Sequence, residues 1–74
     1  MSPLELRFRL RELRERAGLS QDELAERAGT HQSTIWRLES GESRRIDFDL
    51  LDRLARALGV RSEELGVLFE RTRQ

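Results

Sequence analysis

The chain has 74 residues, enough for one domain with a thin core, and it contains no cysteine and a single histidine, His31. These counts exclude a disulfide framework and a thiolate metal site, and one histidine does not make a zinc site, so we expect no metal and no cofactor. Apolar stretches are far shorter than the roughly 18 residues of a membrane-spanning helix, and the N-terminus lacks the pattern of a signal peptide. We therefore expect a cytoplasmic protein without a membrane partner.

Basic and acidic residues balance, fourteen against fourteen, but they are unevenly distributed. Residues 1–19 carry five Arg and three Glu, a net charge of +2, whereas residues 20–29 carry one Arg and three acids, a net charge of −2. Residues 30–45 sum to +1 from three Arg and two Glu, and residues 46–74 sum to −1 from five Arg and six acids. This weak asymmetry permits a polyanionic partner without pointing to one.

The first predicted element is a helix that ends at Gly18. Its start is indicated by Ser2 as N-cap, Pro3 at the first helical position and Glu5 three residues after the cap. A single apolar stripe at helical spacing follows, formed by Leu6, Leu10, Leu13 and Ala17. The start also fits a half-buried strand, because apolar residues alternate at Leu4, Leu6, Phe8 and Leu10. The sequence therefore predicts a helix from about residue 9 onward, with residues 4–8 either helical or extended.

Two short helices are predicted next. Ser20 and Glu23 form a capping box that opens a helix of about eight residues, which Gly29 ends. A further helix is predicted from about Gln32 to Ser40, with its inward side formed by Ile35 and Leu38.

The C-terminal part predicts two more helices. Asp47 or Asp49 can cap the fourth, in which Phe48, Leu51, Leu54, Ala55 and Leu58 keep helical spacing. Ser62 with two following glutamates starts a short fifth helix that stops at Gly66. The predicted fold class is all-α with five helices, with short extended segments at the two ends as an option.

The second and third predicted helices have the features of a helix-turn-helix unit at about residues 20–39. Ala25 is small enough to let the two helices cross closely, and Gly29 can adopt the positive φ of the turn. Ile35 can reach back to the core. The outer face of the third helix then offers hydrogen-bonding side chains, namely Gln32, Ser33 and Arg37.

Three segments carry a resemblance to a known family: GLSQDELAERAG at residues 18–29, STIWRLESG at residues 33–41 and LDRLARALGV at residues 51–60. They closely resemble the Cro and phage-repressor (XRE) type helix-turn-helix family, and the match covers about residues 9–65. The loop at residues 44–48 looks like that of the short single-domain members. The resemblance implies a five-helix lambda-repressor-like domain spanning residues 1–74, which regulates transcription by placing the helix at residues 32–40 in the major groove of double-stranded DNA.

The resemblance also assigns residues to the DNA. Four side chains would face the base edges: Gln32, Ser33, Arg37 and Trp36. The sugar–phosphate backbone would be held by Gln21, Thr30, Ser40, Arg44 and Arg45. The family usually has a polar residue at the position of Trp36. Its ring is therefore expected either at a thymine methyl or deoxyribose, or packed along Gln32 or a partner subunit.

Arg14 and Glu39 occupy positions that form a buried ion pair in this family, the alternative being two ordinary surface charges. Proteins of this kind usually dimerise on symmetric sites, so we expect a homodimer. The expected interface is the apolar C-terminal segment with Leu65, Val67, Leu68 and Phe69. The same residues could instead complete the core of the monomer.

Two other classes of function are weighed against DNA binding. With no cysteine, one histidine and no tyrosine, the chain has no set of groups for catalysis, so we do not expect an enzyme. A protein–protein module of the same fold, such as an antitoxin-like or assembly partner, is the alternative, and the balanced net charge suits it.

Overall fold

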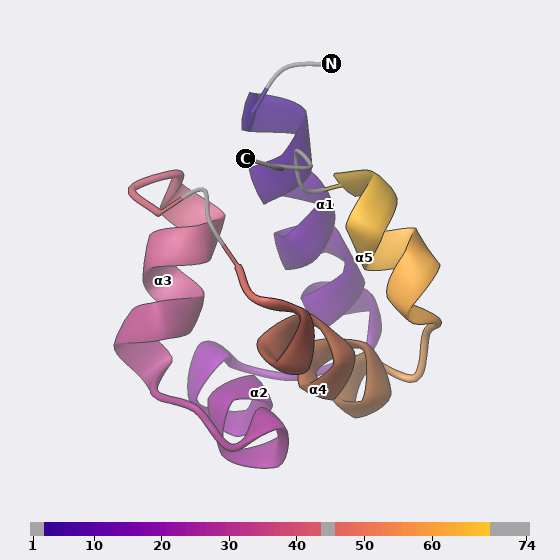
Figure 1. Ribbon diagram of the computed structural model, residues 1–74. Helices are drawn as coiled ribbons and strands as arrows, with labels where there is room; N and C mark the ends of the chain where they lie inside the picture. The colour runs from indigo at the N-terminus through magenta and orange to yellow at the C-terminus, as the bar shows by residue number, and fades with distance from the viewer. Residues whose placement is uncertain (1–2, 44–45, 69–74) are drawn as a thin grey trace.

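The computed structural model describes residues 3–43 and 46–68, with side chains described for residues 9–43 and 46–65 (Figure 1). Five helices make up the described part: α1 Pro3–Arg16, α2 Gln21–Ala28, α3 Gln32–Ser40, α4 Phe48–Leu58 and α5 Ser62–Leu68. The all-α fold predicted from the sequence is confirmed.

The two ends of the fold differ from the sequence-based expectation. Residues 4–8 belong to α1, so the extended alternative for them is wrong; Pro3 suits the first turn of a helix, where a missing N–H costs nothing. At the other end α5 passes through Gly66 and reaches Leu68. A glycine inside a helix costs only about 1 kcal/mol, which the packing of a short helix can offset.

The helix ends follow the local signals in the sequence. At α2 the Glu23 amide donates to Ser20 Oγ at 3.0 Å, and the Ser20 amide donates to Glu23 Oε1 at 2.8 Å, which completes the capping box. At α4 the cap is Asp47, whose Oδ1 accepts from the Leu50 amide at 2.8 Å. Each capped amide would otherwise lack a partner within its helix.

The principal contacts join the helices in a ring: α1 to α3, α3 to α2, α2 to α4, α4 to α5 and α5 back to α1. Figure 1 shows α3 at one edge of the molecule and α5 at the opposite edge. The ring encloses one apolar core, which contains Leu10, Leu13, Leu19, Leu24, Ala25, Ala28, Ile35, Leu38, Leu51, Leu54, Ala55, Leu58 and Leu65. Because α3 packs against α1 and α2 on one side, its other side is left to the surface.

Among the described residues, no helix is both long and apolar enough to cross a membrane.

Candidate nucleic-acid interface

Helices α2 and α3 are joined by a turn that is held from several sides. Gly29 adopts a left-handed conformation with φ of +69°, which costs glycine nothing. The Thr30 amide donates to Ala25 O at 2.9 Å and closes the end of α2. Arg53 of α4 donates from Nη1 to the carbonyls of Ala28 and Gly29, both at 2.8 Å. The turn is therefore fixed to α4, and with it the starting point of α3.

Sequence reasoning missed the role of Arg53. Arg53 forms an ion pair with Asp49 at 3.1 Å, and a spacing of four residues is typical of ordinary surface pairs on a helix. That Nη1 reaches the end of α2 depends on how α2 and α4 cross, for which no local sequence pattern exists.

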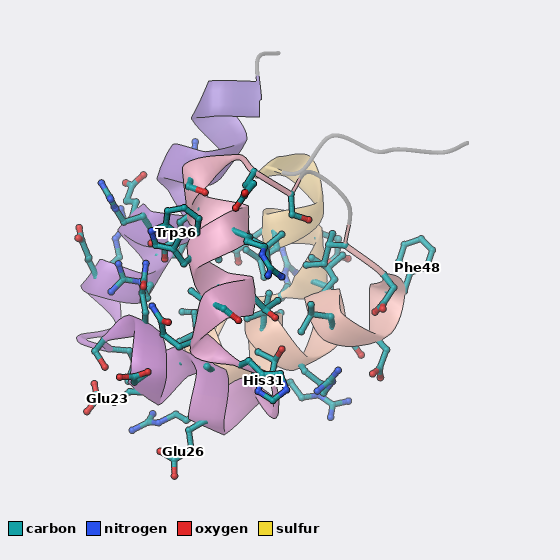
Figure 2. The ribbon with its side chains drawn as sticks, turned by 90° about the vertical axis from the view of Figure 1, so that its left-hand side faces the viewer. Glu23, Glu26, His31, Trp36 and Phe48 are labelled. Carbon is teal, nitrogen blue, oxygen red and sulfur yellow. The ribbon has the colours of Figure 1, made fainter. Side chains whose placement is uncertain are left out.

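The outer face of α3 presents the four side chains that the sequence assigns to bases. Gln32, Ser33, Trp36 and Arg37 are all exposed, whereas Ile35 and Leu38 on the other side are buried. Trp36 is 50% exposed, unusual for the only tryptophan of the chain. Figure 2 shows Trp36 on one side of α3, while Phe48 projects from the edge of the molecule on the other side of that helix.

Two of the predicted DNA-contacting residues bind one another directly. Gln32 Nε2 donates to Gln21 Oε1 at 2.6 Å, and Gln21 Nε2 donates to Glu39 Oε1 at 2.9 Å. The start of α2 and both ends of α3 are thereby linked by side chains. No local pattern predicts this contact, because Gln21 and Gln32 are 11 residues apart on different helices.

The ion pair expected between Arg14 and Glu39 is present and buried. Arg14 Nε donates to Glu39 Oε2 at 2.6 Å and Nη2 donates to Oε1 at 3.1 Å, while Nη1 donates to Leu19 O at 2.8 Å. The two side chains are 10% and 2% exposed, so the alternative of two surface charges is wrong. The hydrogen bond to Glu39 raises the pKa of Arg14 above its ordinary value, although burial acts in the opposite direction.

This raised pKa has a simple consequence for stability. A basic group whose pKa is higher in the folded state contributes stability that is lost only as the pH rises through that pKa. Since an arginine already titrates far above neutral pH, Arg14 stays charged throughout the physiological range.

The residues assigned to the DNA backbone lie at three places around α3. Gln21 is at the start of α2, Thr30 is in the turn before α3, and Ser40 is the last residue of α3. Ser40 Oγ donates to Arg37 O and accepts from the Glu42 amide, both at 3.3 Å. The remaining two, Arg44 and Arg45, lie outside the described residues.

The C-terminal residues do not all behave as expected. Leu65 is 0% exposed and belongs to the core of the monomer, so its assignment to a dimer interface is wrong: a side chain already buried within one chain has no surface to offer a partner. Val67 and Leu68 lie in α5, but their side chains are outside the described set, as is Phe69 altogether.

Phe48 departs from the apolar pattern of α4. It keeps helical spacing with the buried leucines of that helix, yet it is 87% exposed. It is the first residue of α4, where the helix has only begun to pack on the core.

Among the described residues, no group of three or more histidine, cysteine, aspartate or glutamate side chains could hold a metal ion.

The short α2, the glycine turn and the exposed polar face of α3 define a helix-turn-helix protein, a class that binds DNA through the second helix of the motif. The chain belongs to the helix-turn-helix family, whose domain model matches residues 5–68. It is similar in structure to the restriction-modification controller protein C.AhdI from Aeromonas hydrophila, with 35% sequence identity, a TM-score of 0.79 and coverage of 85% of this chain and 94% of that one. The XRE-type resemblance is confirmed, and the protein is a DNA-binding regulator.

Proposed function

We propose that the protein is a sequence-specific transcription regulator that binds a two-fold symmetric operator as a homodimer, with α3 in the major groove. The observation that carries this proposal is the exposed row of Gln32, Ser33, Trp36 and Arg37 on a helix whose other side is anchored by buried Ile35 and Leu38. A rigid helix with polar groups on its free face matches the width of the major groove and the donors and acceptors of its base edges.

Within the groove, each side chain has a role set by its chemistry. The amide of Gln32 pairs with adenine, and the guanidinium of Arg37 pairs with O6 and N7 of guanine, each pair discriminating by about 1–3 kcal/mol. Ser33 binds either kind of base. Trp36 contacts a thymine methyl or a deoxyribose.

The backbone contacts fix the register of α3 in the groove. We assign them to Gln21, Thr30 and Ser40, with Arg44 and Arg45 from the loop that follows α3. Such contacts orient the protein and carry no sequence information. The Gln21 amide has one N–H beyond the one given to Glu39, and this proton can bind a phosphate oxygen.

Dimerisation follows from the small footprint of one recognition helix. Two copies would place α3 in successive major grooves about 34 Å apart. We assign the interface to the C-terminal apolar residues Val67, Leu68 and Phe69. A protein with this role acts in the compartment that holds the DNA, which we take to be the cytoplasm.

The balanced charge makes a prediction about affinity. Binding to random DNA depends on the number of phosphates neutralised, and this chain has no net positive charge to supply it. We therefore expect weak binding to non-specific duplexes at physiological salt, so that base contacts carry most of the discrimination. Strong binding to random DNA above physiological salt would contradict this.

One observation favours a second candidate function. Trp36 at 50% and Phe48 at 87% exposure are large apolar groups open to solvent, and such groups are typical of surfaces that bind other proteins. A protein–protein module of this fold is therefore the alternative.

Selection of bound sequences from a random duplex pool at about 150 mM salt, where surface charges are well screened, separates the two candidates. Enrichment of a two-fold symmetric sequence supports the regulator. The similarity to C.AhdI makes a restriction–modification operon the first genomic region to test against that sequence. Absence of any enriched sequence would contradict the proposal and favour the protein–protein module.

A further inference from the structure

A continuous chain of hydrogen-bonded side chains runs from α1 to the start of α3. It begins at Arg14, which donates hydrogen bonds to both carboxylate oxygens of Glu39, the penultimate residue of α3. Glu39 Oε1 accepts from Gln21 Nε2 at the start of α2, and Gln21 Oε1 accepts from Gln32 Nε2 at the start of α3. The chain thus ends on the side chain proposed to read a base.

The direction of every bond in this chain is fixed by its buried end. Arginine only donates and an ionised carboxylate only accepts, so Glu39 requires the N–H side of the Gln21 amide. The oxygen of Gln21 must then face Gln32, and it requires the N–H side of the Gln32 amide in turn. Rotating either amide by half a turn would set two donors or two acceptors against each other.

Glu39 itself has little freedom to rotate. Its side chain is 2% exposed and held by two bonds from one guanidinium, while Arg14 is held in addition by Leu19 O. These hydrogen-bonded side chains are therefore ordered before DNA binds, so the entropic cost of ordering them is not part of the free energy of binding.

The fixed direction leaves Gln32 with one free N–H and a free Oε1. This is the set that adenine requires, since its N7 accepts and its N6 amino group donates. We propose that Glu39, held by Arg14, is a positioning residue that sets the orientation of the Gln32 amide through Gln21 and so determines the base preference at the position Gln32 reads. This inference rests on the proposed function, because it requires Gln32 to contact a base.

The test exchanges the buried charges for apolar side chains of similar length. Replacing a buried ion pair with well-packed hydrophobic residues is often neutral or stabilising, so R14M/E39M is a variant designed to keep the fold while removing the acceptor for Gln21. Relative affinities are measured for the selected site and for duplexes with single base changes under Gln32 and under Arg37. We expect the preference for adenine under Gln32 to fall by about fivefold or more, and the preference under Arg37 to change by less than about twofold.

A second variant removes the link and leaves the ion pair intact. Gln21→Met removes the amide that connects Glu39 to Gln32. The preference for adenine under Gln32 should therefore fall as it does in R14M/E39M. Any contact of Gln21 with a phosphate weakens all duplexes alike and cancels in the ratio of affinities. Thermal unfolding shows whether R14M/E39M folds. If it does not, Gln21→Met alone tests the positioning role. A spectroscopic readout accompanies both: the side-chain amide protons of Gln32 in the free protein should shift toward those of a solvated amide.

Two further variants serve as controls. E12Q/R16Q removes an exposed ion pair of α1 at 2.9 Å and should leave both base preferences unchanged. Gln32→Ala tests the function on which the inference rests. If Gln32→Ala leaves the base preference intact, Gln32 reads no base and the proposed contact itself fails, together with the inference. If Gln32→Ala abolishes the preference while Gln21→Met and a folded R14M/E39M keep it in full, the positioning role of Glu39 is overturned and the proposed function stands.

Discussion

The two helices of the motif differ in how their starts are stabilised. Helix α2 begins with a complete capping box at Ser20 and Glu23 and has two acids, Asp22 and Glu23, in its first turn. Helix α3 has His31 as its N-cap, but the His31 side chain makes no capping bond, and the first turn of α3 contains no acid. Acids near a helix start stabilise the helix through its dipole. The first helix is therefore a locally stabilised support, whereas the start of the second has neither a side-chain cap nor an acid.

What α3 lacks in local stabilisation it obtains from its neighbours. Ile35 and Leu38 anchor it in the core, and Glu39 ties its last turn to α1. Recognition and stability are thus divided between the helices. Changes in the supports should cost stability, whereas changes on the free face of α3 should cost only binding.

Removing the tie to α1 should have the largest effect. Glu39→Ala leaves the Arg14 guanidinium buried without its partner, and breaking one side of a buried pair typically costs about 3–5 kcal/mol. Urea unfolding followed by helical circular dichroism measures the change. The matched control is Glu12→Ala, which breaks exposed pairs of α1 and should cost less than about 1 kcal/mol. Similar midpoints for the two variants would contradict a supporting role for Glu39.

A change on the free face of α3 should affect binding alone. Arg37→Ala should lower affinity for the selected site by about 1–3 kcal/mol and relax specificity at one position in each half-site. Its unfolding midpoint should stay within experimental error, because Arg37 is exposed. Arg56→Ala on α4 removes the same charge from a side chain that is 81% exposed, and it is the control for net charge. A loss as large for Arg56→Ala would mean that charge rather than base contact is being measured.

The two helix starts can be compared directly by a pair of substitutions with smaller effects. Ser20→Ala removes the side-chain cap of α2 and should cost about 1 kcal/mol of stability. His31→Ala removes no capping bond from α3 and should cost less than about 0.5 kcal/mol. Thermal unfolding of the two variants side by side measures the difference. Equal costs would show that α3 depends on its N-cap after all.

The sequence predicted those features that depend on neighbours along the chain. The capping box at Ser20, the left-handed Gly29 and the buried stripe with Ile35 are local patterns, and the structure has all three. The Arg14–Glu39 pair was expected only from the family resemblance, since its members are 25 residues apart.

Other features depend on how helices cross, and no spacing along the chain encodes that angle. The Gln21–Gln32 contact and the reach of Arg53 to the end of α2 are of this kind. Leu65 illustrates the same limit. Its apolar character fitted either a dimer interface or the core, and only its place opposite α1 and α4 decides for the core.

Recognition of DNA by the free face of α3 can be tested by mapping backbone amide chemical shifts during titration with the selected duplex. We expect the largest shifts on residues 32–40, with further shifts at Gln21 and Thr30 and little change in the middle of α4. Shifts concentrated around Phe48, with residues 32–40 unaffected, would contradict recognition by α3 and place the binding surface at the start of α4.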